Sequence, residues 1–193
     1  MHDLALIRRD AKQRRQQIGP ALRNSKNKSI TKHLLRQPFL QNAKRIGCYV
    51  ASNGEPKVNA LQALVPAIFY WPVIGTNQSV LFGCSATPSR WRENQYGIKE
   101  PQCSRYKLKQ AAALDVILVP LVAFNKHCDR LGMGGGYYDR ALALNNQQQR
   151  PIIIGVAYDT QLYPALTPKP WDIPMDAVVT EVGMYWRYSR NSL

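Results

Sequence analysis

Short, unbroken apolar runs recur along this sequence and alternate with segments that have a helical pattern. The clearest runs are RIGCYVA (45–51), DVILVP (115–120), IIIGVAY (152–158) and AVVTE (177–181). Such runs are typical of strands that are buried on both faces, as in a parallel sheet covered by helices. Strands that alternate with helices favour an α/β fold. We therefore predict a single α/β domain over residues 1–193, with a largely parallel sheet flanked by helices.

Two further strands are predicted from WPVI (71–74) and SVLFGC (79–84). The proline-rich segment YPALTPKPWDIP (163–174) is expected to be a loop, because proline lacks the amide hydrogen that a sheet ladder needs. The polar segment LNNQQQR (144–150) is expected to be a surface loop or a helix end.

Apolar residues at helical spacing predict a long amphipathic N-terminal helix, interrupted near residues 19–20, through Leu4, Ile7, Ala11, Ile18 and Leu22. A second helix is predicted from Ser29 toward Pro38. The segment VNALQALVPAIF (58–69) also has a helical pattern, which its proline should bend or end. A further helix is predicted to begin near Tyr137.

The formal net charge of +14 is concentrated at the N-terminus. Residues 1–36 contain ten lysines and arginines, with Asp3 and Asp10 as the acids. This charge favours anionic partners, such as nucleic acid, an anionic lipid surface or a small polyanionic substrate. We expect residues 1–36 to form a basic helical segment that packs on the domain.

Neither a membrane protein nor a secreted protein is expected. No apolar run approaches the ~20 residues of a membrane-spanning helix, and LALI (4–7) is too short for the apolar part of a secretory signal. The four cysteines contain no C-x-x-C pair, so neither a disulfide framework nor a zinc site is expected. We expect a soluble cytoplasmic protein.

The segment RLGMGGGYYDR (130–140) concentrates glycines ahead of a predicted helix. Its spacing excludes the P-loop and the dinucleotide-binding fingerprint. Glycine nevertheless permits positive φ angles, so that successive amides can converge on an anion where a helix begins. A flexible surface turn is the alternative, but a simple turn needs fewer glycines, and Arg130 and Arg140 bracket this one. The segment therefore favours a phosphate-binding loop.

Asp139, which closes this segment, has two interpretations. A carboxylate beside a bound phosphate is repulsive unless a cation such as Mg²⁺ lies between them. Alternatively, Asp139 is a first-turn acid that complements the helix dipole. The spacing alone leaves both interpretations open.

The longer segment VPLVAFNKHCDRLGMGGGYYDRAL (119–142) closely resembles the signature of 5-formyltetrahydrofolate cyclo-ligases. Four weaker segments agree in order, namely YVASNGEP (49–56), YGIKEP (96–101), GVAYDTQL (155–162) and WDIPMDAVVTE (171–181). The resemblance implies a Rossmann-like α/β domain. It also implies ATP- and magnesium-dependent conversion of 5-formyltetrahydrofolate to 5,10-methenyltetrahydrofolate, with release of ADP and phosphate, through a phosphorylated formyl group.

The resemblance also implies site residues. Those expected to act on the transferred phosphoryl group are Arg130, Tyr138 and Arg140. The expected ATP contacts are Arg130, Leu131, Gly132, Met133, Gly134, Gly135, Gly136, Tyr137 and Tyr138. The expected folate contacts are Val50, Glu55, Met133, Gly134, Gly135, Gly136 and Tyr137, and the expected magnesium ligands are Asp139 and Asp176.

Leu4 departs from the family pattern, which usually has a lysine that helps to bind the ATP phosphates at this position. Arg8, Arg9 and Lys12 are the candidates to take its place, although lysine and arginine present different geometries.

Glu55 has a role that its chemistry supports, because a carboxylate can accept two hydrogen bonds from the N–H edge of a pterin. The alternative is an ordinary turn residue, since Asn53-Gly54 makes a turn by itself. Ligands of open α/β sheets bind beyond the carboxyl ends of the strands. We expect Glu55, the glycine segment and the loop that carries Asp176 to meet there.

Two other functions compete with the cyclo-ligase. A nucleic-acid-binding protein would explain the basic N-terminus, but the sequence has no recognisable nucleic-acid-binding motif. A different enzyme on a related fold, such as a sugar-phosphate isomerase, is the weaker alternative. The expected partners are ATP and 5-formyltetrahydrofolate, with or without a polyglutamate tail, without specific nucleic acid, and the expected state is a monomer.

Overall fold

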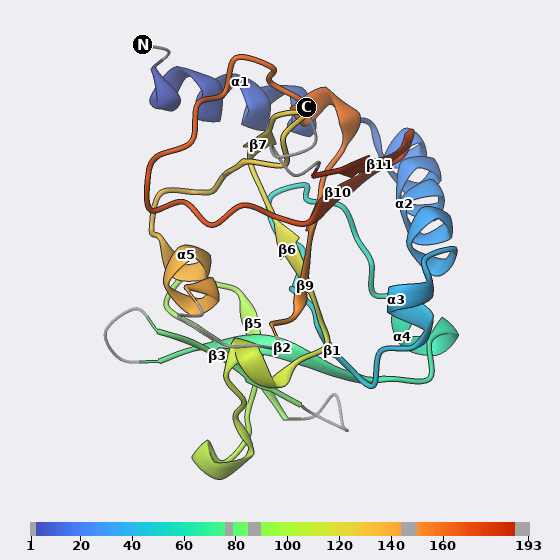
Figure 1. Cartoon of the computed structure of the whole chain (residues 1–193), viewed down its shortest axis with the longest axis vertical. Coiled ribbons are helices and arrows are strands. Elements are labelled where there is room, and N and C mark those ends of the chain that lie inside the picture. Colours follow the sequence, from blue (N-terminus) through green and yellow to red (C-terminus); the bar gives the residue numbers. More distant parts are fainter. Residues whose placement is uncertain (1–2, 76–78, 85–89, 144–149, 188–193) are drawn as a thin grey trace, which may run out of the picture.

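The computed structural model describes residues 3–75, 79–84, 90–143 and 150–187. Its centre is a seven-stranded sheet with the strand order β11-β10-β9-β6-β1-β2-β3 (Figure 1). The strands are β1 (Arg45–Gly47), β2 (Ile68–Ile74), β3 (Val80–Gly83), β6 (Val116–Pro120), β9 (Ile152–Val156), β10 (Ala177–Thr180) and β11 (Gly183–Trp186).

The inner strands of this sheet are parallel, and the two edge strands run against their neighbours. Strand β1 pairs in parallel with β2 and β6, and β9 pairs in parallel with β6 and β10. Strands β3 and β11 are antiparallel to β2 and β10. Every residue of β10 is buried, as are the first four of β6, which is what the unbroken apolar runs require. The predicted α/β fold with a largely parallel sheet is confirmed.

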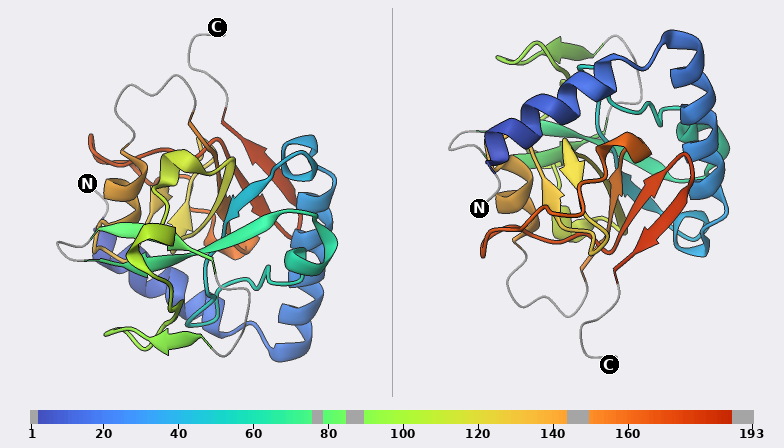
Figure 2. Two further views of the ribbon diagram at one scale, coloured as in Figure 1. Left: turned by 90° about the horizontal axis from the view of Figure 1, so that it is seen from below. Right: turned by 90° about the horizontal axis from the view of Figure 1, so that it is seen from above.

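Helices cover both faces of the sheet (Figures 1 and 2). Helices α2 (Pro20–Leu35), α3 (Pro38–Gln41) and α4 (Leu61–Leu64) supply Ile30, Leu34, Leu40 and Leu61 to the core on one face. Helix α5 (Tyr137–Leu142) supplies Leu142 to the core on the other face.

Helix α1 (Leu4–Gln16) lies at the carboxyl end of the sheet. It packs on β7 (Ala123–Phe124) and on the short helix η4 (Asp159–Gln161), which follow β6 and β9. The Asp3 carboxylate caps the helix by accepting a hydrogen bond of 2.8 Å from the Ala5 amide. The basic N-terminal segment is thus folded against the elements that follow the parallel strands (Figure 2).

The predicted interruption near residues 19–20 is confirmed, because α1 ends at Gln16 and α2 begins at Pro20. Helix α2 starts well before the predicted Ser29, since proline is favoured in the first turn of a helix. The prediction of a helix over 58–69 is wrong. Only Leu61–Leu64 is helical, and the chain enters β2 at Ile68, where pairing with β1 overrides the local pattern.

Two small hairpins were not predicted. Strand β4 (Trp91–Glu93) pairs with β5 (Lys99–Pro101), and β7 pairs with β8 (Arg130–Leu131). These strands are too short to show an alternating pattern. Two further short helices, η2 (Arg105–Lys107) and η3 (Ala111–Ala113), connect β5 to β6.

Three expectations concern features outside the sheet. Most of LNNQQQR, residues 144–149, lies outside the described residues. The four cysteines are free. Among the helices that the structure describes, none combines the length and apolarity of a membrane span.

Candidate functional site

The glycine segment connects β8 to α5 and requires glycine at two positions. Gly134 has φ +108° and Gly136 has φ +63°, both in the region that side chains with a Cβ rarely adopt. Arg8 on α1 donates from Nε to the Gly132 carbonyl oxygen at 2.9 Å. Arg140 donates to the Gly135 carbonyl oxygen at 2.6 Å and lies 5.5 Å from the centre of the Tyr137 ring. Two arginines thus hold the segment by its carbonyl groups.

Arg130 is buried at the base of this segment. Its Nη2 donates to Asp139 Oδ1 at 2.5 Å, and its guanidinium lies 5.6 Å from the centre of the Tyr138 ring. Its Nε atom has no hydrogen-bond partner within the described part of the chain. Asp139 therefore forms an ion pair with Arg130. This ion pair is a third interpretation of Asp139, beside the magnesium ligand and the helix-dipole acid considered from sequence.

Glu55 is largely buried in the turn that follows β1. Asn53 and Gly54 both have positive φ, so the predicted turn is present. The Ser52 amide donates to Glu55 Oε2 at 3.0 Å, and Arg15 Nη1 lies 3.9 Å from Glu55 Oε1. Burial raises the pKa of Glu55, while the bond from Ser52 and the charge of Arg15 lower it. Val50, the other predicted folate contact near this turn, is half-buried beside the core.

Tyr138 of the glycine segment and Tyr49 near the Glu55 turn both have a raised pKa. Burial raises the pKa of Tyr138, and the negative charge of Glu55 raises it further. The pKa of Tyr49 is raised by the same two causes, and its hydroxyl donates to the Pro56 carbonyl oxygen at 2.5 Å. Two segments that are far apart in sequence, 49–56 and 130–140, both contact helix α1, through Arg15 at Glu55 and Arg8 at Gly132.

The N-terminal candidates differ in their contacts. Arg8 reaches the glycine segment, whereas Arg9 is exposed and Lys12 is half-buried on α1. Leu4, at the position of the family lysine, packs with Ile7 against the small core cluster under α1. An apolar contact has therefore taken the place of a cation one turn before Arg8.

The β4–β5 hairpin adds a residue that sequence reasoning missed. The hydroxyl groups of Tyr96 and Tyr137 lie 2.5 Å apart, and their rings meet edge to face at 5.9 Å. Tyr96 is the first residue of the YGIKEP segment. This segment contributed to the family resemblance, but none of its residues was predicted to belong to the site. The hairpin therefore contacts the start of α5 beside the glycine segment.

The structure does not bring Asp176 to this site. Asp176 precedes β10, at the amino ends of the parallel strands, where its carboxylate accepts bonds of 2.8 and 2.5 Å from Arg150 and 2.8 Å from the Ile153 amide. Asp139 is paired with Arg130 instead. Among the described residues there is also no group of three or more His, Cys, Asp or Glu side chains that could hold a metal. The expectation that Asp176 joins the other two segments is therefore corrected, although Leu166 of the same loop packs with Leu131 and Ala11.

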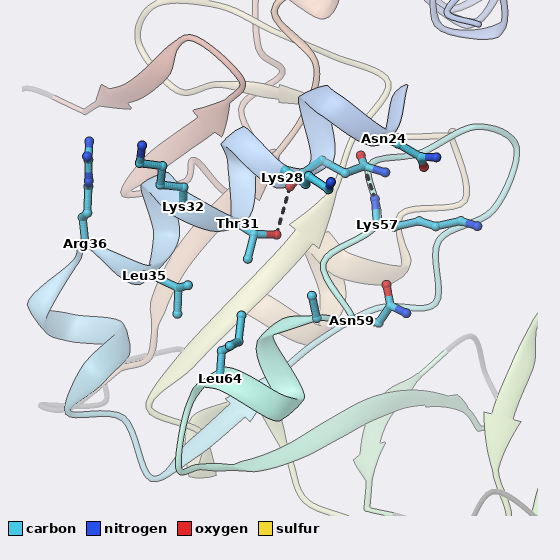
Figure 3. Close-up of a pocket in the computed structure, with 11 residues that line it drawn as sticks. Asn24, Lys28, Thr31, Lys32, Leu35, Arg36, Lys57, Asn59 and Leu64 are labelled. Atoms are coloured by element: carbon cyan, nitrogen blue, oxygen red, sulfur yellow. Dashed lines mark hydrogen bonds between the residues drawn. The ribbon is translucent and has the colours of Figure 1, made fainter. Parts of the chain in front are cut away.

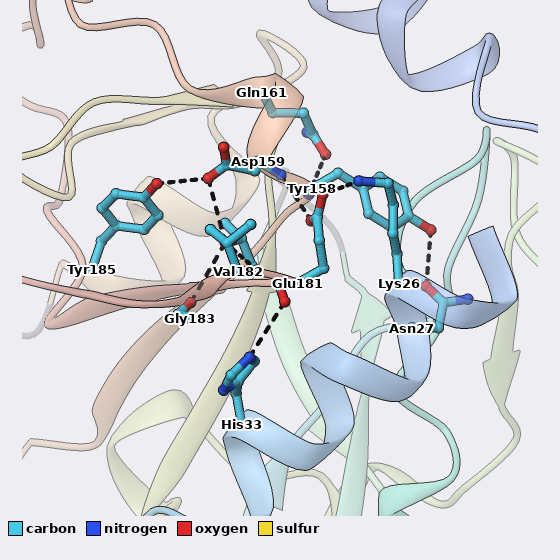
Figure 4. Close-up of polar contacts among 11 residues, drawn as sticks. Lys26, Asn27, His33, Tyr158, Asp159, Gln161, Glu181, Val182, Gly183 and Tyr185 are labelled. Carbon is cyan, nitrogen blue, oxygen red and sulfur yellow. Dashed lines mark hydrogen bonds and ion pairs between the residues drawn. The ribbon is translucent and has the colours of Figure 1, made fainter. Parts of the chain in front are cut away.

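A polar network at the carboxyl ends of β9 and β10 fixes α2 to the sheet (Figure 4). Glu181 pairs with Lys26 and accepts a bond of 2.9 Å from the Asp159 amide. The Asp159 carboxylate in turn accepts a bond of 2.6 Å from the Tyr185 hydroxyl. His33 lies 3.3 Å from the Glu181 carbonyl oxygen. These contacts hold in place the strands whose ends lie beside the candidate site.

A groove of about 670 Å³ lies between α2 and residues 57–64, and none of the predicted site residues lines it (Figure 3). Its charged lining residues are all basic, and its apolar residues are Leu35, Ala60 and Leu64. The Lys57 amide donates to Asn27 at 3.2 Å, which joins the groove wall to α2. The basic residues are Lys28, Lys32, Arg36 and Lys57.

A family model described as the 5-formyltetrahydrofolate cyclo-ligase family matches residues 1–181. This chain belongs to that family. Cyclo-ligases of Haemophilus influenzae and Escherichia coli K12 are similar to it, with 32% identity over 177 residues and 31% over 175. These alignments cover 88% of this chain in both cases, and 92% and 95% of the two relatives.

Solved structures agree with the family assignment. The NMR structure of the Aquifex aeolicus 5,10-methenyltetrahydrofolate synthetase matches with a TM-score of 0.84 and 26% identity, over 98% of this chain and 95% of that one. The structure of a Mycoplasma pneumoniae synthetase matches with a TM-score of 0.74 over 93% of this chain, and at 23% identity it supports the fold alone. The resemblance inferred from the glycine segment is confirmed.

Proposed function

We propose that this cyclo-ligase family member converts 5-formyltetrahydrofolate to 5,10-methenyltetrahydrofolate and hydrolyses ATP to ADP and phosphate in the process. One observation carries the proposal: helix α1 contacts both the glycine segment and the buried Glu55 turn, since Arg8 bonds to the Gly132 carbonyl oxygen at 2.9 Å and Arg15 Nη1 lies 3.9 Å from Glu55 Oε1. A carboxylate suited to a pterin and a backbone suited to phosphate thus both lie against α1. We also propose that residues 1–193 act as one domain and as a cytoplasmic monomer, without specific nucleic acid.

In this proposal the glycine segment binds the ATP phosphates through its amides. Its carbonyl groups at Gly132 and Gly135 are already bonded to Arg8 and Arg140, which places two cations beside the bound anion. The contacts from 130 to 138 belong to this ATP site, and Arg9 and Lys12 lie on the same helix as Arg8.

The folate is proposed to bind with its pterin edge at Glu55 and with its remaining contacts at Val50, at Tyr137 and along residues 133–136. Met133 is exposed and Tyr137 is held by Tyr96. An apolar side chain and an aromatic ring therefore adjoin the phosphate-binding backbone, which suits a ligand with a flat heterocycle.

The chemistry requires positioning rather than a protein nucleophile. The formyl oxygen attacks the γ-phosphorus of ATP, and the bond from that phosphorus to ADP breaks. N10 then attacks the formyl carbon, loses its proton, and phosphate leaves with the former formyl oxygen. In this proposal Arg130, Arg140 and the Tyr138 hydroxyl stabilise charge on the transferred group.

Magnesium belongs to this proposal as the counter-ion of ATP. The described residues do not fit a site built from both Asp139 and Asp176, because each carboxylate is bonded to a different arginine. No step above depends on the metal. Asp139 would have to exchange Arg130 for the ion in order to ligate it.

The test combines product formation with isotope transfer. Purified protein, ATP, Mg²⁺ and 5-formyltetrahydrofolate should give the absorbance of the methenyl product, with one ADP per product, and no product without ATP. A formyl group labelled with heavy oxygen should deliver its label to the released phosphate. Folded protein that binds ATP but forms no product contradicts the function. Product without label in phosphate contradicts only the phosphorylated intermediate.

We further propose that the basic groove accepts the polyglutamate tail of a folate. Lys28, Lys32 and Arg36 recur every four residues along α2, and Lys57 lies two residues after Glu55. A row of carboxylates would meet a row of cations. Replacing Lys28 and Lys32 with alanine should raise the KM for a polyglutamylated substrate and leave that for the monoglutamate unchanged. Equal effects on both substrates contradict this assignment.

A further inference from the structure

Arg15 on α1 is a buried cation that the reaction proposed above does not use. Its side chain is 1% exposed. Nη1 donates to the Leu121 carbonyl oxygen at 3.3 Å, and Nε has no hydrogen-bond partner in the described part of the chain. From sequence alone Arg15 is one of ten basic residues in the segment 1–36.

Burial of Arg15 is not explained by stability. Removing a guanidinium from water costs several kcal/mol, and a close, well-bonded partner is needed to offset this cost. The one carbonyl bond is long, and the carboxylate of Glu55 is 3.9 Å away. An apolar side chain of similar length would fill this position at lower cost.

The groups that act on Glu55 come from three elements. Arg15 faces it from α1, Tyr138 from α5, and Tyr49 and Ser52 from the segment that follows β1. The charges of Arg23 on α2 and Tyr158 after β9 act on Arg15, and Arg23 also lies beside Gly54. Arg23 donates to the carbonyl oxygens of Arg15 and Ile18 at 3.3 and 3.0 Å. Arg15 is therefore the cation paired with the buried Glu55 carboxylate, at 3.9 Å.

The separation of the pair has a chemical consequence. Ser52 bonds to Glu55 Oε2 only, and 3.9 Å is too long for a hydrogen bond from Arg15 to Oε1. Arg15 therefore supplies positive charge without occupying an acceptor position on Oε1. A ligand with two adjacent N–H groups could donate hydrogen bonds to this ionised carboxylate, because Arg15 does not occupy Oε1.

We propose that Arg15 is a positioning residue that keeps Glu55 ionised and its Oε1 open for the N–H edge of the pterin. The inference rests on the proposed function. Burial favours the neutral acid, and a neutral carboxyl offers a donor where the pterin also offers one. Removing the Arg15 charge raises the pKa of Glu55, so folate binding should be lost at a higher pH as the solution is acidified.

The experiment measures kcat and KM for 5-formyltetrahydrofolate against pH for wild type and for Arg15→Met, which keeps an unbranched side chain without the charge. The midpoint of the acidic fall in kcat/KM should move up by about one pH unit or more. At a pH below both midpoints, kcat/KM of Arg15→Met should be at least about tenfold lower than that of wild type. Arg15→Lys should restore the wild-type midpoint. In Glu55→Gln the acidic fall in kcat/KM should be absent. It should also be absent in the Arg15→Met/Glu55→Gln double variant.

An unmoved midpoint in folded Arg15→Met would overturn the inference, and so would a shift of equal size in the Glu55→Gln background. If Arg15→Met does not fold, the Arg15→Met/Glu55→Gln double variant decides. Charge compensation expects the double variant to fold, whereas a role in packing alone leaves it unfolded. Carbon NMR of the Glu55 carboxyl follows the same titration without turnover, so failure of the proposed function remains distinguishable.

Discussion

At the scale of single residues, the glycine segment is defined by backbone angles. Gly136 has φ +63°, and a Cβ there would lie 2.9 Å from Arg140 Nη1. The left-handed conformation costs an alanine about 1–2 kcal/mol, and Arg140 would have to move away from the Gly135 carbonyl. We expect Gly136→Ala to weaken binding of a non-hydrolysable ATP analogue about tenfold, measured by calorimetry.

Gly183→Ala is the matched control for this variant. Gly183 also has a positive φ, of +151°, but nothing lies within 4 Å of its added Cβ. It lies at the start of β11, away from the glycine segment. A loss of thermal stability without a loss of ATP affinity is expected. Undiminished ATP binding by Gly136→Ala would remove the segment from its proposed role.

Variants of Asp139 and Asp176 should respond differently to the magnesium concentration. In Asp139→Asn the Mg²⁺ concentration for half-maximal rate should rise if this carboxylate exchanges Arg130 for the ion. In Asp176→Asn that concentration should stay unchanged, because its bonds to Arg150 and the Ile153 amide are structural. Its unfolding free energy should instead fall by about 1 kcal/mol. Equal magnesium shifts in both variants would restore the shared metal site.

At the scale of elements, sequence reasoning succeeded where one local requirement decides the structure. Strands β6, β9 and β10 were predicted because burial on both faces demands apolar residues throughout. The segment 58–69 was predicted wrongly because its second half pairs with β1, a contact that no local pattern reveals. In the site, the glycine segment was recognisable because its backbone needs glycine. The burial of Arg15 depends on how α1 docks, so its sequence neighbours cannot indicate it.

Helix α1 offers a test of the departure at Leu4. Leu4 lies one turn before Arg8, so both side chains lie on the same face of the helix, and Arg8 bonds to the glycine segment. We expect Leu4→Lys to strengthen ATP binding about fivefold, a gain of about 1 kcal/mol from a nearby charge. Leu6→Lys is the control, since Leu6 is 51% exposed on α1. Equal gains in both variants would point to general attraction rather than to a phosphate contact.

At the scale of the whole molecule, the arrangement of α1 and the sheet places basic groups around an anion-binding site. Helix α1 lies on the elements that follow β6 and β9, and Arg8 and Arg140 both touch the glycine segment. Part of the net charge of +14 that suggested nucleic acid therefore lies at the proposed ATP site. Charge at this scale acts mainly on the rate of encounter rather than on the chemical step.

The salt dependence of the kinetics tests whether this charge acts on the rate of encounter. Long-range attraction is largely screened once the Debye length falls from about 10 Å at 0.1 M salt toward about 3 Å at 1 M. We expect kcat/KM for ATP and for the folate to fall as sodium chloride rises, while kcat at saturating substrate stays nearly constant, because saturation removes the dependence on the rate of encounter. Replacing exposed Lys28 and Lys32 with glutamine should flatten the slope for a polyglutamylated folate, and leave the slopes for ATP and the monoglutamate unchanged, without changing kcat. A kcat that falls in parallel with kcat/KM would indicate that salt disturbs the site itself.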